Sequence, residues 1–358
     1  MEVGIAMAIK TLADRREPLV DVYKVATDEM VLAEELGFDF VSTSEHHFED
    51  DAWSPSQMVI LANVAGRTSR IRLHTNVFLL PLHHPLRVSE DAATVDLLSG
   101  GRLDLVCGTG SVLEEFVAFG VDAKKRWGRF WEAMEILRTS FTGEEFTFEG
   151  RHFTIPEPIR QTTTPVQQPF PLWVGGLGPK LQRESGRRGF HAQGAGGDGG
   201  ANFRPEYLEG CAEADVDPMT RNLAMFVSGH LAPSQKQAWD ECKEGWWNWQ
   251  NEYRKRTWIA MLDGLGFVPP LEPLEQLHDG PPPGNRMAPL LGTPDEILAS
   301  LQPLLENSQT THFSFAFRSS GGGMPAELAQ ATMRLFAREC LPTLKSWGRE
   351  PVTSRAQG

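Results

Sequence analysis

The sequence predicts an α/β protein, specifically a (β/α)8 TIM barrel with insertions after the fourth strand and between the seventh and eighth strands. Short apolar strands alternate with amphipathic helices along most of the chain, and glycines end several of these helices. Such alternation implies parallel strands joined by helical crossovers. Eight βα units favour a closed barrel, and an open doubly wound sheet is the alternative. The eight strands are expected near residues 3–9, 38–44, 71–79, 102–107, 171–175, 190–193, 223–231 and 312–317.

Three helices illustrate the pattern. In the segment from Pro18 to Leu36, apolar residues recur at steps of three and four, which is the period of an amphipathic helix. Pro18 suits the first helical position, and Gly37 can adopt the left-handed conformation that ends a helix. The helices expected at 86–98 and 179–188 are also followed by glycines, and a strand comes after each.

Two segments interrupt the alternation. Residues 143–170 contain "GEEFTFEGRHFTIPEP", which predicts a β-hairpin that turns near Glu149 and Gly150. Residues 236–292 contain a Trp-rich helix followed by a Pro/Gly-rich loop, and long loops within compact domains are usually functional or disordered. We expect this second segment to form a lid over one end of the barrel. Residues 1–347 then form a single domain, and residues 348–358 form a C-terminal tail.

Composition excludes several classes of protein. The net charge is −13 and the pI is near 5.3, whereas binding to nucleic acid requires a basic surface. No segment approaches the roughly 20 apolar residues of a membrane span, and the N-terminus lacks the pattern of a signal peptide. The four cysteines are widely spaced, which indicates reduced thiols in a cytoplasmic protein.

The stretch "FVSTSEHHFEDD" places Glu45, His46 and His47 at the end of the second predicted strand. The third strand ends in "LPLHHPL", with His83 and His84 at the corresponding position. In a (β/α)8 barrel the active site lies at the carboxyl ends of the strands. Single histidines there are usually structural, but two pairs at neighbouring strand ends make catalysis and structure about equally favoured.

Histidines and a carboxylate at this rim raise the alternative of a metal-dependent hydrolase. Adjacent residues on a strand point in different directions, however, and we expect His46 and His47 to diverge. The sequence contains no HxH pair, and no later strand end clearly supplies another ligand. We therefore predict no metal site.

Three glycine-rich turns are candidate ligand sites. "GAGGDG", from Gly194 to Gly199, matches GxGxxG but does not open a helix, so we interpret the match as chance. "VGGLGPK" lies between a strand and a helix, where free N–H groups and the helix dipole favour an anion. "CGTG", which begins at Cys107, follows the fourth strand. Tight turns without a ligand remain the alternative, and Cys107 is better explained as a buried thiol than as a nucleophile.

Several segments together resemble the bacterial luciferase-like monooxygenase family. They are "AEELGFDFVSTSEHHF", "LPLHHPLRVSEDAATVDLLSGGRLDLVCGTG", "PLWVGGLGPKLQRESGRRGF" and "GTPDEILASL", and the resemblance covers about residues 3–345. It implies a (β/α)8 barrel that receives reduced FMN (FMNH2) from a separate flavin reductase. The flavin would react with O2 to form a C4a-peroxyflavin that oxidises a small organic substrate. It also implies a homodimer.

The resemblance also implies roles for particular residues. His46 matches the family's catalytic base, which Glu45 or His47 would orient, and His84 matches a histidine near the flavin. A cis peptide bond between residues that are not proline is expected at Asn76–Val77, behind the flavin ring. The residues implied in cofactor binding are Asn76, Val77, Gly108, Thr109, Gly110, Gly176, Leu177, Gly178, Lys180 and Leu181.

The chain departs from the family pattern at the phosphate site. Thr109 stands where a phosphate-contacting arginine is expected, and Gly178 stands where a serine is expected. Backbone N–H groups with Lys180 or Arg183 would then bind the phosphate. Gly108 matches the family's thiol near the flavin, with Cys107 one position away.

Two other functions stay open at this point. Related barrels use the deazaflavin F420 for hydride transfer without oxygen, and a non-catalytic flavin-binding paralogue is the third candidate. The EHHF stretch favours oxygen chemistry. The Trp-rich insertion favours an apolar or aromatic substrate.

Overall fold

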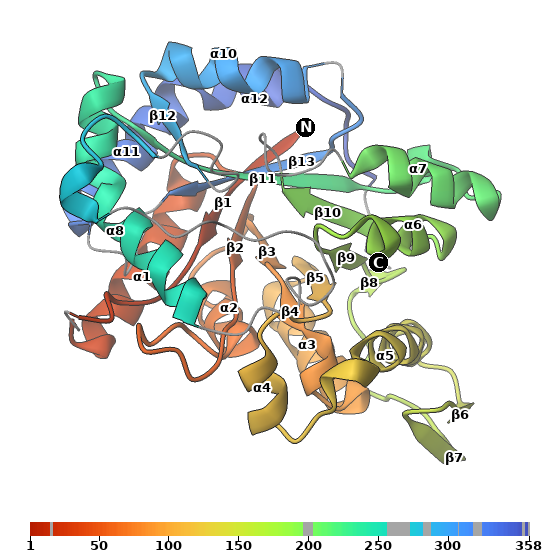
Figure 1. Cartoon of the computed structure of the whole chain (residues 1–358). Helices are drawn as coiled ribbons and strands as arrows, with labels where there is room; N and C mark the ends of the chain where they lie inside the picture. Colours follow the sequence, from red (N-terminus) through yellow and green to blue (C-terminus); the bar gives the residue numbers. More distant parts are fainter. Residues whose placement is uncertain are drawn as a thin grey trace.

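Eight parallel strands form a closed ring in the computed structural model (Figure 1). The pairings run from β1 to β2, β3, β5, β9, β10, β11 and β13, and β13 pairs with β1 again. The closed ring confirms the predicted barrel over an open sheet. The strands are β1 (Glu2–Met7), β2 (Phe40–Thr43), β3 (Arg72–Thr75), β5 (Leu103–Gly108), β9 (Leu172–Gly175), β10 (His191–Ala195), β11 (Leu223–Leu231) and β13 (His312–Phe317).

The structure describes residues 1–14, 17–195, 203–255, 273–281, 288–306, 308–317, 324–352 and 355–356. Among these, no helix combines the length and apolar composition that crossing a membrane requires. The described helices are α1 (Leu19–Glu35), α2 (Gln57–Ala65), α3 (Pro85–Ser99), α4 (Leu113–Ala118), α5 (Arg126–Ser140), α6 (Pro179–Arg187), α7 (Arg204–Glu213), α8 (Gln235–Lys255), α10 (Pro294–Leu305), α11 (Ala326–Glu339) and α12 (Leu341–Ser346).

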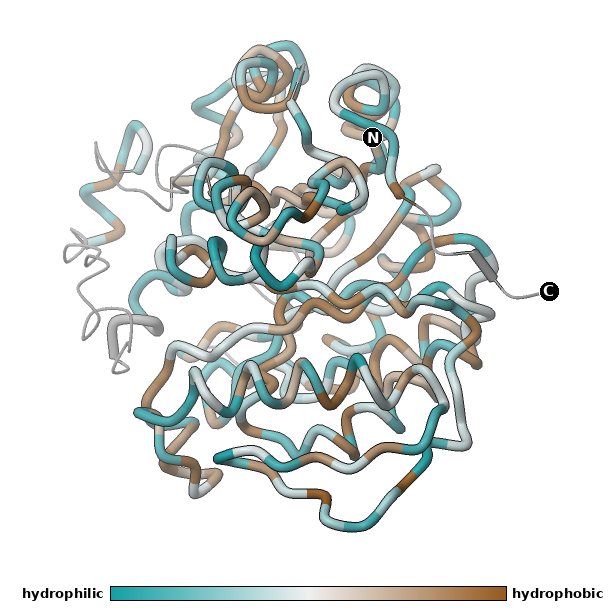
Figure 2. The backbone as a smooth tube through the Cα atoms, turned by 90° about the vertical axis from the view of Figure 1, so that its right-hand side faces the viewer, coloured by the Kyte–Doolittle hydropathy of each residue, from teal (hydrophilic) through white to brown (hydrophobic). Residues whose placement is uncertain are grey.

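Amphipathic helices cover the outside of the barrel. Figure 2 shows hydrophobic and hydrophilic segments alternating along them. Their apolar faces and the outward residues of the strands form the main core, which includes Met30, Leu61 and Ile136 from helices and Val3 and Phe313 from strands. Gly100 ends α3 with φ +68°, a conformation that glycine adopts without a Cβ penalty.

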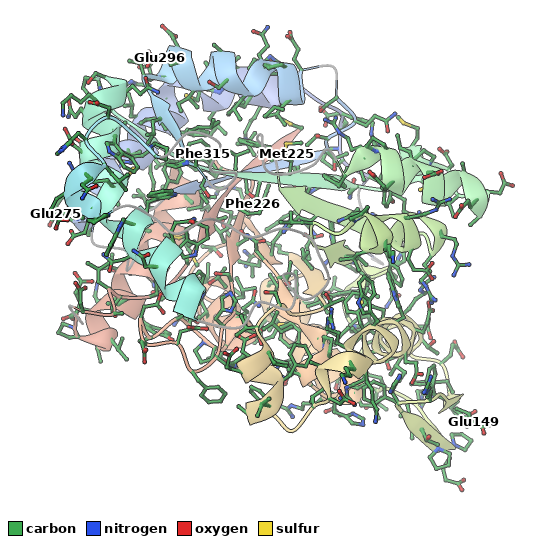
Figure 3. All side chains as sticks on the ribbon, viewed as in Figure 1. Glu149, Met225, Phe226, Glu275, Glu296 and Phe315 are labelled. Carbon is green, nitrogen blue, oxygen red and sulfur yellow. The ribbon has the colours of Figure 1, made fainter. Side chains whose placement is uncertain are left out.

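The segment after β5 contains the expected hairpin. Strands β6 (Phe146–Glu149) and β7 (Thr154–Ile159) pair antiparallel. The carboxylate of Glu132, on α5, accepts hydrogen bonds from the backbone N–H groups of residues 151–153 in the turn. Glu149 lies at the outer edge of the molecule, away from the barrel (Figure 3).

The second insertion is described only in part. Its helix is α8, and Trp239 and Trp246 of that helix are fully buried. The short strand β12 (Leu290–Gly292) extends the sheet beside β11. The predicted lid also includes residues 256–272 and 282–287, which lie outside the described residues.

Inward-facing side chains fill the lower end of the barrel, where the strands begin. Asp104 is fully enclosed and is contacted by Arg72 Nη2 at 2.6 Å, His74 Nε2 at 3.0 Å and Trp173 Nε1 at 3.0 Å. Burial alone would raise the pKa of the Asp104 carboxyl, but Arg72 and His74 hold the pKa well below its usual range. This end of the barrel is a closed ionic layer, so a ligand site belongs at the opposite end.

This ionic layer should make the folding stability of the protein sensitive to acid. Burial lowers the pKa of His74, so this imidazole binds a proton less readily in the folded protein than in the unfolded chain, where its pKa is about 6.5. The stability linked to this difference is therefore present above that pH and is lost as the pH falls. We expect His74→Gln to reduce the slope of unfolding free energy against pH, between pH 6.5 and 5, by up to about 1.4 kcal/mol per pH unit.

The measurement is urea unfolding at several pH values. The same substitution at the exposed His278 serves as the control. An unchanged slope in His74→Gln would contradict the assignment.

Candidate active site

The buried carboxylate of Glu45, just past the end of β2, collects hydrogen bonds at the barrel rim. Its Oε1 lies 2.8 Å from His47 Nε2 and 3.2 Å from His83 Nε2. Its Oε2 accepts from Gln57 Nε2 at 2.9 Å and from the backbone N–H of Leu79 at 3.3 Å. Burial opposes ionisation, but the hydrogen bonds from His47 and His83 lower the pKa of Glu45 to about 2. The rim therefore contains a fixed negative charge shared by two imidazoles.

A second carboxylate holds His46. The Nδ1 atom of His46 lies 2.9 Å from Glu115 Oε1, and the His46 ring meets Trp53 edge-on with centroids 4.8 Å apart. His46 and His47 thus diverge to different carboxylates, as expected. Glu45 or His47 was predicted to orient His46, but the ring nitrogen of His46 contacts Glu115, which the sequence reasoning missed. Glu115 lies on a short helix without a recognisable motif.

Gln57, at the start of α2, connects Glu45 to the Asn76–Val77 peptide. This peptide bond is cis, as predicted. Gln57 Oε1 accepts from the N–H of Asn76 at 3.0 Å, and Gln57 Nε2 donates to the carbonyl of Val77 at 3.0 Å. Gln193 of β10 donates to Asn76 Oδ1 at 2.6 Å. One amide side chain therefore links the charged cluster to the end of the third barrel strand.

Two glycines accommodate the side chain of Val77. A Cβ at Gly108 would lie 2.3 Å from Val77 Cγ2, and a Cβ at Gly175 would lie 2.3 Å from Val77 Cγ1. Gly110 and Gly176 are likewise close to Phe116 and Leu181, with φ +78° and +155°. Protein side chains thus account for these four glycines, so their presence alone does not indicate a ligand.

The start of α6 is partly consistent with the predicted anion site. Lys180 and Leu177 are exposed there, and Gly178 is the residue before the helix. Leu181 instead points into the core. Arg183 is bound by Glu209 at 3.0 Å and by Glu213 of α7, so of the two predicted cations only Lys180 stays a candidate for phosphate.

The two histidines at the end of the third strand lie in different surroundings. His84 is exposed, and its Nδ1 accepts from the backbone N–H of Leu86 at 3.3 Å, which caps α3. His83 is the residue that reaches Glu45. The position before Pro85, the first residue of a helix, is a capping position, and that signal could have distinguished the two.

The remaining sequence candidates have structural explanations. Cys107 is fully buried, and burial together with the nearby charge of Glu45 raises the pKa of its thiol far above the usual range, which excludes a thiolate. Gly194 packs against Phe203, and residues 196–199 of the "GAGGDG" stretch lie outside the described residues.

Two groups of side chains have the composition of metal ligands. They are Glu45 with His47 and His83, and His46 with Glu49 and Glu115. Hydrogen bonds account for the first group, because Glu45 Oε1 is the acceptor for both imidazoles. We assign no metal to either group.

Side chains inside the upper barrel are accessible. Along β11, Met225 and Val227 belong to the core outside the barrel, whereas Phe226 and Ser228 are only partly buried. Alternation along a strand turns Phe226 and Ser228 to the inside. Phe226 lies near the middle of the molecule in Figure 3. Solvent therefore reaches the interior at the level of the rim residues.

An apolar cluster lies beside His46. Trp53 packs with Trp239, Trp246 and Trp249 of α8 and with Met324. Trp53 also contacts His46, so this tryptophan cluster packs directly against the side chain that was predicted to be catalytic. The Trp-rich helix therefore supplies core packing beside the site.

The fold and the site together define the class, which is an enzyme of the (β/α)8 type. Its strands are parallel, an ionic layer closes the end of the barrel where they begin, and an imidazole–carboxylate cluster lies at the end where they finish. The chain belongs to the luciferase-like monooxygenase family, whose model matches residues 1–305.

Relatives within the family differ in cofactor. The chain is similar to 4-hydroxyprotoasukamycin monooxygenase of Streptomyces nodosus subsp. asukaensis, with 28% identity over 62% of each chain. It is also similar to an F420-dependent glucose-6-phosphate dehydrogenase of Beutenbergia cavernae, with 26% identity over 89% of this chain and 93% of the other. An uncharacterised protein of Sinorhizobium fredii is 38% identical over 45% of this chain, and the match spans about half of that relative, 48%.

Solved structures agree on the fold. The monooxygenase RslO1 of Streptomyces bottropensis superposes with a TM-score of 0.79 at 25% identity, covering 96% of this chain and 99% of RslO1. The oxygenating constituent of 3,6-diketocamphane monooxygenase of Pseudomonas putida, solved with FMN, gives a TM-score of 0.76 at 20% identity and covers 98% and 100%.

The packing of Val77 gives a testable coupling. We expect Gly108→Ala to lower the free energy of unfolding by about 1–3 kcal/mol, because the new methyl group would collide with a Val77 methyl. Val77→Ala removes that methyl, so the double variant should recover part of the loss. Urea unfolding of both single variants and the double variant measures the coupling. Strictly additive effects would contradict it.

Proposed function

We propose that the protein is a flavin-dependent monooxygenase that uses reduced FMN and O2 to oxidise a small, predominantly apolar organic molecule. The observation that carries this proposal is His46, a partly exposed imidazole at the rim that contacts a buried carboxylate. Imidazoles exchange protons near neutral pH, which suits a general base. Similarity to two monooxygenases, RslO1 and the asukamycin-type enzyme, supports the same reaction class.

The rim residues suit a flat aromatic cofactor. The accessible inner face at Phe226 and Ser228 provides entry, and the Asn76–Val77 segment lies at the same end. Thr109 and Gly110 follow β5 and are partly exposed there. When bound, reduced FMN supplies the electrons that reduce O2.

Each protein group then has a limited task. His46 accepts a proton at the ring nitrogen that does not face Glu115. Glu45 keeps His47 and His83 in place and maintains a negative charge at the rim. Lys180, with the backbone N–H groups at the start of α6, binds the phosphate.

The tryptophan cluster favours an apolar or aromatic substrate, because its surface next to His46 is dominated by indole and thioether groups. A separate flavin reductase would supply the reduced cofactor. We also propose a cytoplasmic homodimer. The acidic net charge of −13 supports neither nucleic acid nor anionic membranes as partners.

The alternative function is F420-dependent hydride transfer. The observation that favours it is the dehydrogenase of Beutenbergia cavernae, whose similarity spans 89% of this chain. Thr109, in place of the expected arginine, also weakens the case for the phosphate of FMN.

Cofactor titration distinguishes the two functions. We expect the apoprotein to bind FMN more tightly than F420. We also expect Lys180→Ala to weaken FMN binding about tenfold while leaving riboflavin binding unchanged, because FMN carries a phosphate and riboflavin does not. Arg183→Ala is the matched control, since Glu209 and Glu213 already bind Arg183. Tighter binding of F420 would overturn the proposal.

Removal of the base should separate chemistry from binding. We expect His46→Ala to retain the fold and FMN affinity but to lose about 10²-fold or more in substrate oxidation in a single turnover with reduced FMN and O2. Product per flavin measures the loss. His84→Ala is the comparison, because His84 caps α3 instead of joining the cluster. Unchanged single-turnover oxidation in His46→Ala would refute the assignment.

A further inference from the structure

Glu115 lies on α4, outside every strand end, and its side chain is completely buried. Its Oε1 atom contacts two groups, His46 Nδ1 at 2.9 Å and the backbone N–H of His47 at 2.9 Å. Its Oε2 atom is buried and has no hydrogen-bond partner in the described part of the chain. Leaving a buried carboxylate oxygen unpaired is costly, so the well-paired Oε1 is the atom that binds the chain here.

We infer that Glu115 is a positioning residue that fixes the tautomer of His46, with the proton on Nδ1 and the lone pair on Nε2. This inference rests on the proposed role of His46 as the base. The backbone N–H of His47 can only donate, and it donates to Oε1. An ionised carboxylate only accepts, so His46 Nδ1, which contacts the same oxygen of ionised Glu115, donates its own proton.

The tautomer determines what His46 can do. A neutral imidazole with the proton on Nδ1 can accept a proton only at Nε2, which becomes N–H as the ring becomes a cation. The carboxylate on the Nδ1 side then stabilises that cation. No other bond forms or breaks in this step.

The two buried carboxylates of the site thus have separate roles. Glu45 is satisfied by His47, His83, Gln57 and the backbone of Leu79. In the described part of the chain, the hydrogen bonds of Glu115 go instead to His46 and to the backbone of His47. The charged groups near His46 include Glu115 from α4 and Glu49 from the loop after β2, among the residues that the structure describes. The buried Lys10–Asp51 pair lies beyond Trp53.

The first test measures the tautomer in the apoprotein by long-range ¹H–¹⁵N NMR of the histidine rings. His46→Ala assigns the signal. We expect Nδ1–H in the wild type and in Glu115→Gln, whose amide oxygen can still accept, and we expect loss of that preference in Glu115→Leu. Glu49→Gln is the matched control, since it removes a nearby charge and leaves the Nδ1 acceptor in place. An Nε2–H tautomer in the wild type, or an unchanged tautomer in Glu115→Leu, would overturn the inference.

The second test uses the pH profile of kcat/KM for substrate oxidation. Glu115→Gln removes the negative charge that favours the imidazolium, so the acid limb of the profile should move to lower pH by about one unit. Glu115→Leu should lower kcat about 10²-fold, because the lone pair no longer stays on Nε2. Circular dichroism confirms that each variant is folded.

If Glu115→Leu does not fold, the pH profile of Glu115→Gln still tests whether Glu115 acts on His46. A carboxylate with a purely structural role would leave the acid limb of that profile in place. The tautomer measurement needs no cofactor. Failure of FMN binding would therefore remove the proposed function without affecting the tautomer, and a wrong tautomer would remove this inference while leaving the flavin assignment intact.

Discussion

The buried charge of Glu45 is the constraint on which the upper end of the barrel depends. An ionised carboxylate in a protein interior is stable only when donors surround it. Here the donors come from the stretch after β2, from the start of α2 and from the turn after β3. Satisfying one side chain therefore fixes segments of two successive crossover connections relative to each other. Without the Glu45 carboxylate, His47 and His83 would lose the one acceptor atom that they share.

Gln57 transmits this constraint to the backbone. Its amide group contacts Glu45 on one side and the Asn76–Val77 peptide on the other, and Gln193 holds Asn76 from β10. The Val77 side chain in turn fits between Gly108 and Gly175 on the next two strands. A continuous set of polar and apolar contacts thus runs from β2 to β10 across the rim, which places a rigid surface beside His46.

The sequence predicted the barrel well because its signals are local. Apolar period, glycine stops and the order of strands and helices all act within about 20 residues, and all eight barrel strands were placed near their observed positions. The site was predicted only where residues follow a strand directly, as with Glu45, His46 and His47. Gln57 lies on a helix 12 residues after Glu45, and Glu115 lies on a helix 69 residues after His46. At both positions a buried polar residue has no periodic signature. His83 and His84 differ by one position, and only the capping geometry before Pro85 distinguishes them.

Glycines illustrate why the cofactor was harder to infer than the fold. A glycine-rich turn after a strand is compatible with a bound phosphate, a tight turn or the close approach of a side chain. These three causes select the same glycine-rich sequence, so the sequence does not distinguish them. At Gly108, Gly110, Gly175 and Gly176 the neighbouring side chains occupy the space that a Cβ would need. These positions belong to the packing of the barrel rim and would be required with either FMN or F420. Discrimination between cofactors must therefore come from groups that are accessible and charged, and Lys180 at the start of α6 is the residue that meets both conditions most directly among the predicted set.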